Sequence, residues 1–550
     1  MKKSLFNIVS ILTIALFVAS CNDAAKMAKY ASLVKSECTP EVLECVANEI
    51  TATYSLTFPE KYFAKNAVLE VTPVLVYDGG TVAAPVHKIQ GEKVLENNTV
   101  IYRTPGGAVK NTVTFQYVPG MEKATLELRA VVKANGKEYA IPTAYKLADG
   151  TNCTYMLVCT DALKNGGASV AKDNYQDILK ETKEAQIKYL INNSTVRSNQ
   201  LTTAEIKEFK AFLKEVENDA KRTVVSNDII AYASPDGSYD LNDKLSQNRA
   251  KTAEKAFNKK VAKGFGAPVN VSQVAEDWEG FKELVEASNI EDKDLILRVL
   301  SMYSDPAVRE REIKNMSAVF TSLKDKVLPE LRRARFIANI DVQNRTDKEL
   351  LEAIENNDIV LDEESLLKAA TLVDNAETKI ALYKKAAELY NSDRANNNLA
   401  VEYLKAGKAA EAKAALNKMA NKDEMYYNNL GIAELQSKNY EAASAAFTKA
   451  NTPAAKANNA AILILNGKYS EAAAALAGTK SFNEALANVL VNNTAKAESI
   501  LAGQKCEKSA YLRAVVNARN GKNDAAKKEL SSVTGKLAER AAKDIEFAKL

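Results

Sequence analysis

Residues 232–250, YASPDGSYDLNDKLSQNRA, combine the residue types of a small anion-binding site. Pro235 and Gly237 mark a tight turn after an apolar run that suits a buried strand. Asn242 then suits a helix N-cap, and Arg249 follows at helical spacing. The first N–H groups of a helix are unpaired, and the planar guanidinium of arginine binds a carboxylate through two parallel hydrogen bonds. The spacing therefore predicts a strand, a turn and a helix that together bind a carboxylate.

The same stretch carries a family resemblance. Asn242, Leu245, Ser246, Arg249 and Ala250 fit the pattern N-x-x-L-S-x-x-R-A behind a glycine-bearing turn. This resembles the signature of the OmpA-like peptidoglycan-binding family. In that family the arginine binds a carboxylate of diaminopimelate in the wall peptide, and an aspartate in the turn holds the amine. The resemblance implies that this chain binds the cell wall without covalent attachment.

One position departs from the family pattern. Ser234 stands where the family has its aspartate, and Asp236 follows two residues later and is able to take over the amine contact. The candidate peptidoglycan-binding residues are therefore Arg249, Asp236, Ser234 and Asn242. The alternative is that Arg249 forms an ordinary ion pair on the helix surface and that the loop is only a turn.

The N-terminus has the pattern of an export signal. Lys2 and Lys3 precede an apolar core over residues 5–18, which is short for a membrane span. Residues 18–21, VASC, resemble a bacterial lipobox, which implies cleavage of residues 1–20 and lipidation of Cys21 by acyl chains such as palmitate. Asn22 at the next position favours the outer membrane by resemblance to lipoprotein sorting. The alternative is ordinary secretion with a free thiol at Cys21.

Composition limits the classes of partner and of chemistry. Of the 550 residues 26% are charged, and the formal net charge is +4, of which two units leave with the signal. A nearly neutral chain argues against nucleic acid as a partner. With His87 as the only histidine, most catalytic triads and a Cys/His metal site are disfavoured. We therefore expect no enzyme activity, no metal and no cofactor.

The cysteines suggest local cross-links. Cys38 lies close in sequence to Cys45, and Cys153 lies close to Cys159. In an oxidising periplasm each pair is a candidate disulfide, and neither spacing is a zinc signature. Cys506 is left over and is expected to be a small buried apolar residue.

A β-rich region precedes the signature. After an anchor and linker at residues 21–49, apolar residues alternate in four runs within residues 50–150. Asn135-Gly136, between two apolar runs, is a strong hairpin signal. Short strands at this spacing predict a β-sandwich of immunoglobulin-like size, joined by a linker at residues 151–183 to the next domain.

Residues 184–343 contain the wall-binding candidate. Residues 185–191 read as its first strand, and residues 331–336, LRRARF, resemble the closing arginine pair and last strand of the family. Residues 276–329 are longer than the family's connection and predict a helical insertion that contains Trp278. The tryptophan suits core packing, with stacking on a sugar as the alternative.

The rest of the chain, residues 347–550, is helical and repetitive. Asn397-Asn398, Asn428-Asn429 and Asn458-Asn459 recur about every 30 residues, each followed by a turn and an alanine-rich helix. The pattern resembles tetratricopeptide repeats and predicts a solenoid with a concave surface for a protein partner. Two interpretations of the asparagines stay open: they hydrogen-bond a peptide backbone in the groove, or they cap helices and bond within the stack.

The predicted fold class is multidomain α+β: a β-sandwich, an OmpA-like α/β domain and an α-helical repeat solenoid. The predicted function is an outer-membrane lipoprotein, mainly periplasmic, that binds peptidoglycan and offers its repeats to an unknown protein partner. The alternative is a scaffold subunit of an envelope secretion or surface-fibre assembly machine with a degenerate wall-binding domain. Ser234 in place of the acid keeps that alternative open.

Overall fold

The computed structural model describes residues 23–263, 266–290, 293–315, 323–356 and 360–550. These residues form two compact units. Unit 1 combines the β-rich region with most of the helical repeats, up to residue 172 and from residue 375 onward. Unit 2 spans residues 173–374. The predicted Cys21 and the signal segment lie outside the described residues.

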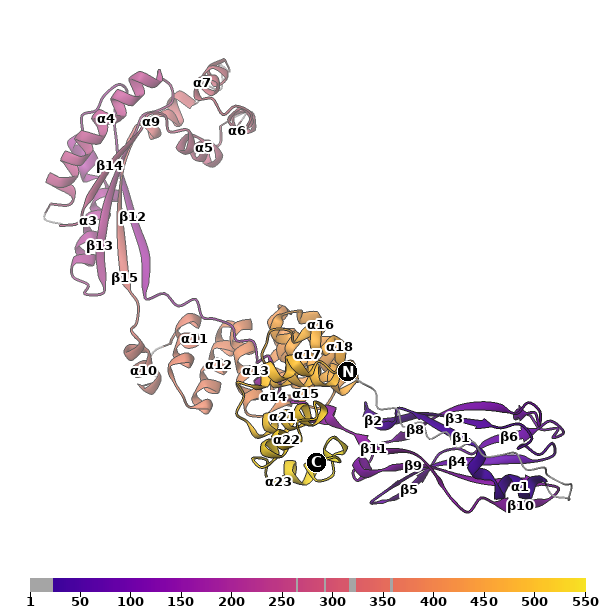
Figure 1. Ribbon diagram of the computed structural model, residues 1–550. Coiled ribbons are helices and arrows are strands. Elements are labelled where there is room, and N and C mark those ends of the chain that lie inside the picture. Colours follow the sequence, from indigo (N-terminus) through magenta and orange to yellow (C-terminus); the bar gives the residue numbers. More distant parts are fainter. Residues whose placement is uncertain (1–22, 264–265, 291–292, 316–322, 357–359) are drawn as a thin grey trace. The chain divides into compact units, whose positions relative to one another are not determined.

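The β-rich part of unit 1 is one curled, 11-stranded sheet, preceded by the short helix α1 (Asp23–Lys29) (Figure 1). Its path runs β1-β3-β2-β11-β9-β4-β6-β7, with β10 on β9, β5 on β4 and β8 on β3. The strands are β1 (Lys35–Thr39), β2 (Val42–Val46), β3 (Glu49–Phe58), β4 (Val68–Tyr77), β5 (Gly80–Ala83), β6 (His87–Gly91), β7 (Thr99–Ile101), β8 (Gly107–Gln116), β9 (Thr125–Ala134), β10 (Lys137–Ala140) and β11 (Tyr145–Asn152).

Alternating burial gives this sheet one face that lines a shared core. In β3 every second side chain is buried, and these residues share one hydrophobic core with buried residues of β4 and β9. Strand β2 pairs with β3 on one side and with β11 on the other, so it joins the two halves. The predicted hairpin is confirmed: Asn135 and Gly136 both have positive φ, and Ala134 pairs with Lys137 across a two-residue turn.

The main body of unit 2 is a four-stranded sheet in the order β12-β15-β13-β14. Strands β12 (Ile178–Lys188), β15 (Arg333–Gln343) and β13 (Arg222–Tyr232) are antiparallel neighbours, and β14 (Val269–Val274) is parallel to β13. Helices α3 (Ala204–Glu217) and α4 (Tyr239–Ala256) pack on one face of the sheet, with a π-helical turn at Phe257–Val261 (Figure 1). The first strand begins and ends earlier than the predicted residues 185–191.

The predicted helical insertion forms its own small core. It contains α5 (Trp278–Ala287), α6 (Lys293–Met302), α7 (Pro306–Asn315) and α9 (Leu328–Leu331). Phe281, Val285 and Ile296 are buried together in it, and Trp278 packs edge-on against Phe281 at 5.6 Å between ring centroids. Unit 2 also includes α10 (Asp347–Asn356) and α11 (Glu363–Leu372).

The helical repeats of unit 1 are antiparallel hairpins in succession. Their first helices are α13 (Asp393–Lys405), α15 (Glu424–Gln436), α17 (Pro453–Leu465), α19 (Phe482–Leu490) and α21 (Glu507–Arg519). Their second helices are α14 (Ala409–Leu416), α16 (Tyr440–Ala450), α18 (Tyr469–Ala475), α20 (Thr494–Leu501) and α22 (Asn523–Leu530). Helix α12 (Ala376–Tyr390) precedes them, and α23 (Gly535–Ala541) and a 3-10 turn (Ile545–Phe547) follow.

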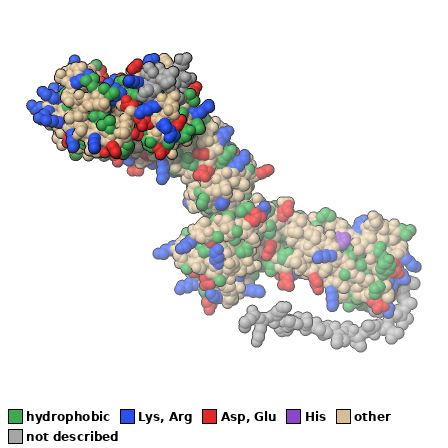
Figure 2. Space-filling model, turned by 90° about the horizontal axis from the view of Figure 1, so that it is seen from above, with side chains coloured by type: hydrophobic (Ala, Val, Ile, Leu, Met, Phe, Trp, Pro, Cys, Tyr) green, Lys and Arg blue, Asp and Glu red, His purple; other side chains and the backbone are tan. Residues whose placement is uncertain are grey.

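The predicted coarse organisation is confirmed: the chain is a multidomain α+β protein with a β-rich region near its N-terminus and helical repeats toward its C-terminus. In the view of Figure 2, acidic and basic side chains are interspersed, in keeping with the nearly neutral chain. Across the described residues, none of the helices combines the length and apolar character that crossing a membrane requires.

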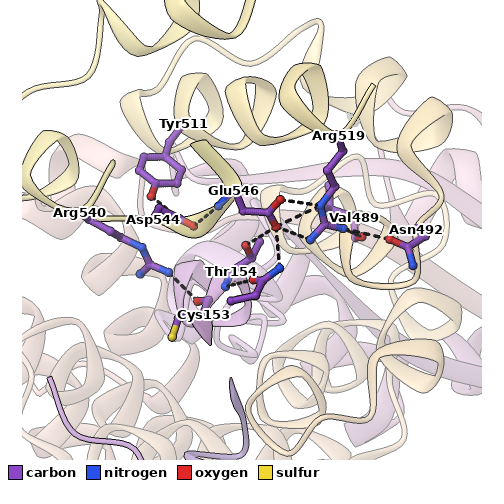
Figure 3. Close-up of polar contacts among 10 residues, drawn as sticks. Cys153, Thr154, Val489, Asn492, Tyr511, Arg519, Arg540, Asp544 and Glu546 are labelled. Carbon is purple, nitrogen blue, oxygen red and sulfur yellow. Dashed lines mark hydrogen bonds and ion pairs between the residues drawn. The ribbon is translucent and has the colours of Figure 1, made fainter. Parts of the chain in front are cut away.

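The C-terminus ties the repeats to the curled sheet. Glu546 pairs with Arg519 and also accepts hydrogen bonds from Asn152 at 2.8 Å and from Thr154 at 3.0 Å, just beyond β11 (Figure 3). Arg540 donates to the carbonyl of Cys153 at 2.6 Å. Both ion-paired side chains are largely buried at this junction.

A glycine permits the closest approach at this junction. Gly467 lies in the turn between α17 and α18, and a Cβ atom there would meet a methyl group of Val46 in β2 at 2.3 Å. Its φ of +74° also favours glycine. The backbone of the repeat turn at Gly467 therefore packs against the side chain of Val46 in the sheet.

Candidate functional site

Arg249 lies at the centre of the predicted site but not on its surface. The residue is 0% exposed, and its guanidinium donates to the carbonyls of Tyr232 at 2.8 Å, Asn193 at 3.1 Å and Leu190 at 3.2 Å. It also stacks over the ring of Tyr189 at 5.1 Å. Arg249 thus joins the chain beyond β12 to the end of β13, which neither predicted role anticipated.

Burial changes the electrostatics of this arginine. Desolvation lowers the pKa of Arg249 to about 10, and the nearby charge of Arg332 lowers the pKa further, while Asp236 acts in the opposite direction. The group is still protonated at neutral pH. Three of its five N–H groups donate to backbone carbonyls of described residues.

Asp236 and Ser234 are brought together with a third residue, Arg332. The Ser234 hydroxyl donates to the Asp236 carboxylate, and Arg332 donates to the Ser234 oxygen at 3.3 Å and to Asp236 Oδ2 at 3.3 Å. The Asp236 side chain is 20% exposed and the Arg332 side chain 10%. Ser234 therefore links Asp236 to an arginine.

Arg332 is a member of this cluster that sequence reasoning did not assign to the site. It belongs to the closing arginine pair, but the sequence did not show which of the two faces the loop. The structure separates their roles, because Arg333 instead pairs with Asp277 at 2.9 Å and stacks on Tyr232. Asp277 also caps α5, so Arg333 fixes the base of the insertion to the sheet.

The predicted N-cap role of Asn242 is wrong. Helix α4 already begins at Tyr239, and the cap position is Ser238, whose side chain makes no capping hydrogen bond. Asn242 is buried inside the first turns and donates from Nδ2 to the carbonyl of Gly237 at 3.0 Å. It therefore holds the loop in shape, and the N–H groups at the start of α4 lack a side-chain cap.

The insertion borders the loop closely. A small cavity of about 10 Å³ lies between Pro235, Asp236, Trp278 and residues of α7. Lys314 of α7 donates to the backbone carbonyl of Asp236 at 3.3 Å. The cavity has room for little more than a water molecule, so the loop is closed in this conformation.

The summed charge of the cluster is positive. Arg249 and Arg332 contribute two guanidinium groups around the single carboxylate of Asp236, next to an uncapped helix N-terminus. Buried charges are costly unless they are paired. The arrangement is chemically suited to an anion such as a carboxylate, and its acid offers a contact for an amine.

A second site is formed by six asparagines on the first helices of successive repeats, which we call the asparagine ladder: Asn397, Asn398, Asn428, Asn429, Asn458 and Asn483. They bind residues 159–171 of the same chain, the groove segment. Asn398 accepts from the N–H of Ala171 at 2.8 Å and donates to its carbonyl at 2.9 Å. Asn429 does the same at Ser169, with both distances 2.8 Å.

The ladder continues along the stack. Asn458 accepts from the N–H of Gly166 at 2.8 Å, and Asn483 pairs with both backbone groups of Cys159 at 2.9 and 2.8 Å. The segment runs antiparallel to the order of the repeats. A Cβ on Gly166 would lie 2.0 Å from the carbonyl oxygen of Ala454, so the backbone passes very close to α17.

The ladder answers the question left open about these asparagines. They do hydrogen-bond a peptide backbone, and that peptide is the chain's own segment after β11. They also bond within the stack, as between Asn429 and Asn397 at 2.8 Å. An asparagine side chain that hydrogen-bonds both the N–H and the carbonyl of one residue recognises the backbone and does not distinguish the side chain of that residue.

The structure does not join either predicted local cysteine pair, and the strand register places Cys38 too far from Cys45 for a disulfide. Cys38 lies opposite Tyr54 and Cys45 opposite Ile50 on the same strand, β3. Four residues along a strand span about 13 Å, and a disulfide needs Cα atoms within about 7 Å.

The remaining three cysteines lie in different surroundings. Cys159 is held in the groove by Asn483, while Cys153 belongs to the hydrophobic core. Cys506 is exposed just before α21 and contacts the Ser509 hydroxyl at 3.0 Å, so the prediction of a buried residue is wrong. Within the described ranges, His, Cys, Asp and Glu residues do not gather in threes at any place able to hold a metal ion.

Comparison with known proteins adds a weak structural likeness. No protein-family model matches the chain, and a search of curated proteins gives no match either. Among solved structures, the chain is similar to a tetratricopeptide repeat protein from Parabacteroides merdae at 16% identity and a TM-score of 0.28. The match covers 36% of this chain and 91% of that one. At this TM-score the likeness carries no argument.

Proposed function

We propose that this protein is a lipid-anchored outer-membrane protein that binds peptidoglycan non-covalently through unit 2. The observation that carries the proposal is the excess positive charge of Arg249 and Arg332 over Asp236 at the uncapped start of α4. The resemblance of residues 242–250 to the OmpA-like signature supplies the ligand class, a wall peptide with a diaminopimelate side chain. In this proposal the cluster binds the ligand and does not catalyse a reaction on it.

The ligand would present both of its charges to this cluster. Its carboxylate would face the two arginines and the N–H groups of α4, where charge-assisted hydrogen bonds are strongest. Its amine would face Asp236, which is the most exposed member of the cluster. Because the neighbouring cavity is about 10 Å³, binding requires the contact between Lys314 and the loop to open.

The repeats have a different role in this proposal. Their asparagine ladder is filled by the groove segment, so a protein partner would have to bind another face or displace that segment. We therefore propose that the repeats first serve as a rigid support that joins the β-rich region to the chain leading into unit 2. Recruitment of a partner is a secondary proposal.

The decisive experiment is a sacculus pull-down with the full-length protein in detergent. Asp236→Asn removes the charge that would bind the amine and keeps the size of the side chain. The matched control is Asp341→Asn in β15, because Asp341 is similarly exposed and pairs with Lys180 away from the loop. We expect the amount of Asp236→Asn protein that pellets with the wall to fall about tenfold, a loss of about 1.4 kcal/mol.

Competition refines the result. Free diaminopimelate should release the parent protein, whereas lysine, which keeps both amines but lacks the second carboxylate, should not. If Asp236→Asn pellets as well as the parent and the control, the cluster is not a wall site. The scaffold alternative, in which the wall-binding domain is degenerate, then takes first place.

The lipid anchor has its own test, because Cys21 lies outside the described residues. Cys21→Ser should move the protein from the membrane fraction to the soluble fraction and abolish incorporation of labelled palmitate. Retention in the membrane fraction would contradict the anchor without bearing on wall binding.

A further inference from the structure

Two buried cysteines from distant parts of the sequence face each other in unit 1. Strand β2 runs parallel to β11, with Leu43 opposite Thr151 and Glu44 opposite Asn152. Cys45 is the next residue of β2, and Cys153 is the first residue beyond the end of β11, so the two cysteines follow directly on the last paired residues. Directly opposed residues on neighbouring strands lie about 4.8 Å apart, and disulfides join Cα atoms about 4.4–6.8 Å apart.

Burial shows that the two side chains point to the same side. Leu43 and Cys45 are the buried residues of β2, and Thr151 and Cys153 are buried at the matching positions. Both cysteines belong to one hydrophobic core. The Sγ atom of Cys45 also lies 3.7 Å from the hydroxyl of Tyr155, two residues beyond Cys153.

The electrostatics of the pair agree with close contact. Interaction with the Cys153 thiol lowers the pKa of Cys45, and interaction with the Cys45 thiol, together with burial, raises the pKa of Cys153. Opposite shifts of this kind are expected of two thiols in direct contact.

We propose that Cys45 and Cys153 form a non-local disulfide in the exported protein. As the chain folds, the Cys45 thiolate attacks the disulfide of an oxidised dithiol oxidoreductase and forms a mixed disulfide. The Cys153 thiol, losing its proton, then attacks Cys45 Sγ and releases the donor. Two thiols lose two protons and two electrons, which the donor takes up to become a dithiol.

The position gives the bond a structural purpose. Cys153 is followed directly by the turn that leads into the groove segment, and its carbonyl accepts from Arg540 (Figure 3). Cys45 is followed by Val46, which packs on the repeat turn at Gly467. The disulfide would therefore cross-link the sheet at the place where the repeats dock on it.

The test maps the linkage in the full-length protein in two arms. In the first, cells are quenched in acid, free thiols are alkylated under denaturing conditions, and the protein is digested without reduction. In the second, purified protein is reduced, unfolded and refolded in a glutathione redox buffer before the same digestion. A Glu-specific protease separates Cys38 from Cys45, and chymotrypsin separates Cys153 from Cys159.

We expect a cross-linked peptide that joins Cys45 to Cys153 in both arms, while Cys38, Cys159 and Cys506 carry the alkylating label. Cys38→Ser should leave the cross-link intact. A link within either local pair, or full labelling of Cys45 and Cys153 in either arm, overturns the proposal. The refolding arm does not depend on export or on wall binding, so its result is distinguishable from failure of the proposed function.

Discussion

Replacing Asn429 by alanine tests whether the asparagine ladder holds unit 1 together. Asn429 is buried and makes three hydrogen bonds of 2.8 Å, two to the backbone of Ser169 and one to Asn397. Each buried hydrogen bond contributes about 1 kcal/mol net, and an unpaired partner costs up to about 3 kcal/mol. We therefore expect Asn429→Ala to lower the free energy of unfolding of unit 1 by about 3 kcal/mol.

The matched control is Asn459→Ala. Asn459 occupies the equivalent second position of an asparagine pair, but its Oδ1 has no hydrogen-bond partner among the described residues. The same substitution there removes no bond to the groove segment. We expect a change within about 0.5 kcal/mol, as for substitutions that disturb no specific contact.

Urea unfolding followed by two probes measures the effect. Circular dichroism at 222 nm follows mainly the repeat helices, whereas the only tryptophan, Trp278, reports on unit 2. With a slope of about 3 kcal/mol per molar urea, the dichroism midpoint of Asn429→Ala should fall by about 1 M. The fluorescence midpoint should not move. Equal dichroism midpoints for Asn429→Ala and Asn459→Ala would refute the structural role of the ladder.

Three further outcomes are expected. Gly166→Ala should destabilise unit 1 by about 1–3 kcal/mol in the same assay, because the new methyl group would overlap the α17 backbone, while Gly503→Ala, which has open space, should not. A hydrogen bond from Lys221 lowers the pKa of Glu349 from 4.5 to about 2. The stabilisation by the Glu349 carboxylate is thus present above pH 4.5 and lost as the pH falls toward 2. A ¹³C titration of the Glu349 carboxyl group with its midpoint at 4.5 would contradict the lowered pKa. Lys314→Ala removes the contact that closes the loop, so we expect about fivefold stronger retention on sacculi, whereas unchanged or weaker retention would contradict the need for opening.

Local chemistry made several elements predictable from the sequence. The turn at Asn135-Gly136 needs two residues with positive φ, and few other dipeptides supply them. The repeats were visible because small residues and paired asparagines recur with the period of one helical hairpin. The turn and helix around Pro235 and Arg249 followed from turn residues and helical spacing, although Asn242 proved to lie inside the helix.

Only the tertiary structure showed which segment the asparagines bind and which residues Arg332 contacts. No local pattern shows that the asparagines bind Ser169 and Ala171. Their amide side chains bind backbone groups, which every residue carries, so the bound segment has no characteristic sequence. Arg332 reaches Asp236 only because β15 lies beside β13 in the sheet.

The cysteines show the same limit. Proximity in sequence favoured pairing Cys38 with Cys45, but β1 and β2 pair with separate parts of β3. The parallel pairing of β2 with β11 instead brings Cys45 into one core with Cys153, the residue that follows β11. Sequence thus determined the turns, the helix faces and the repeat period, which depend on neighbouring residues. Strand register and the filling of the groove depend on contacts between residues far apart in the chain, and only the folded structure fixes them.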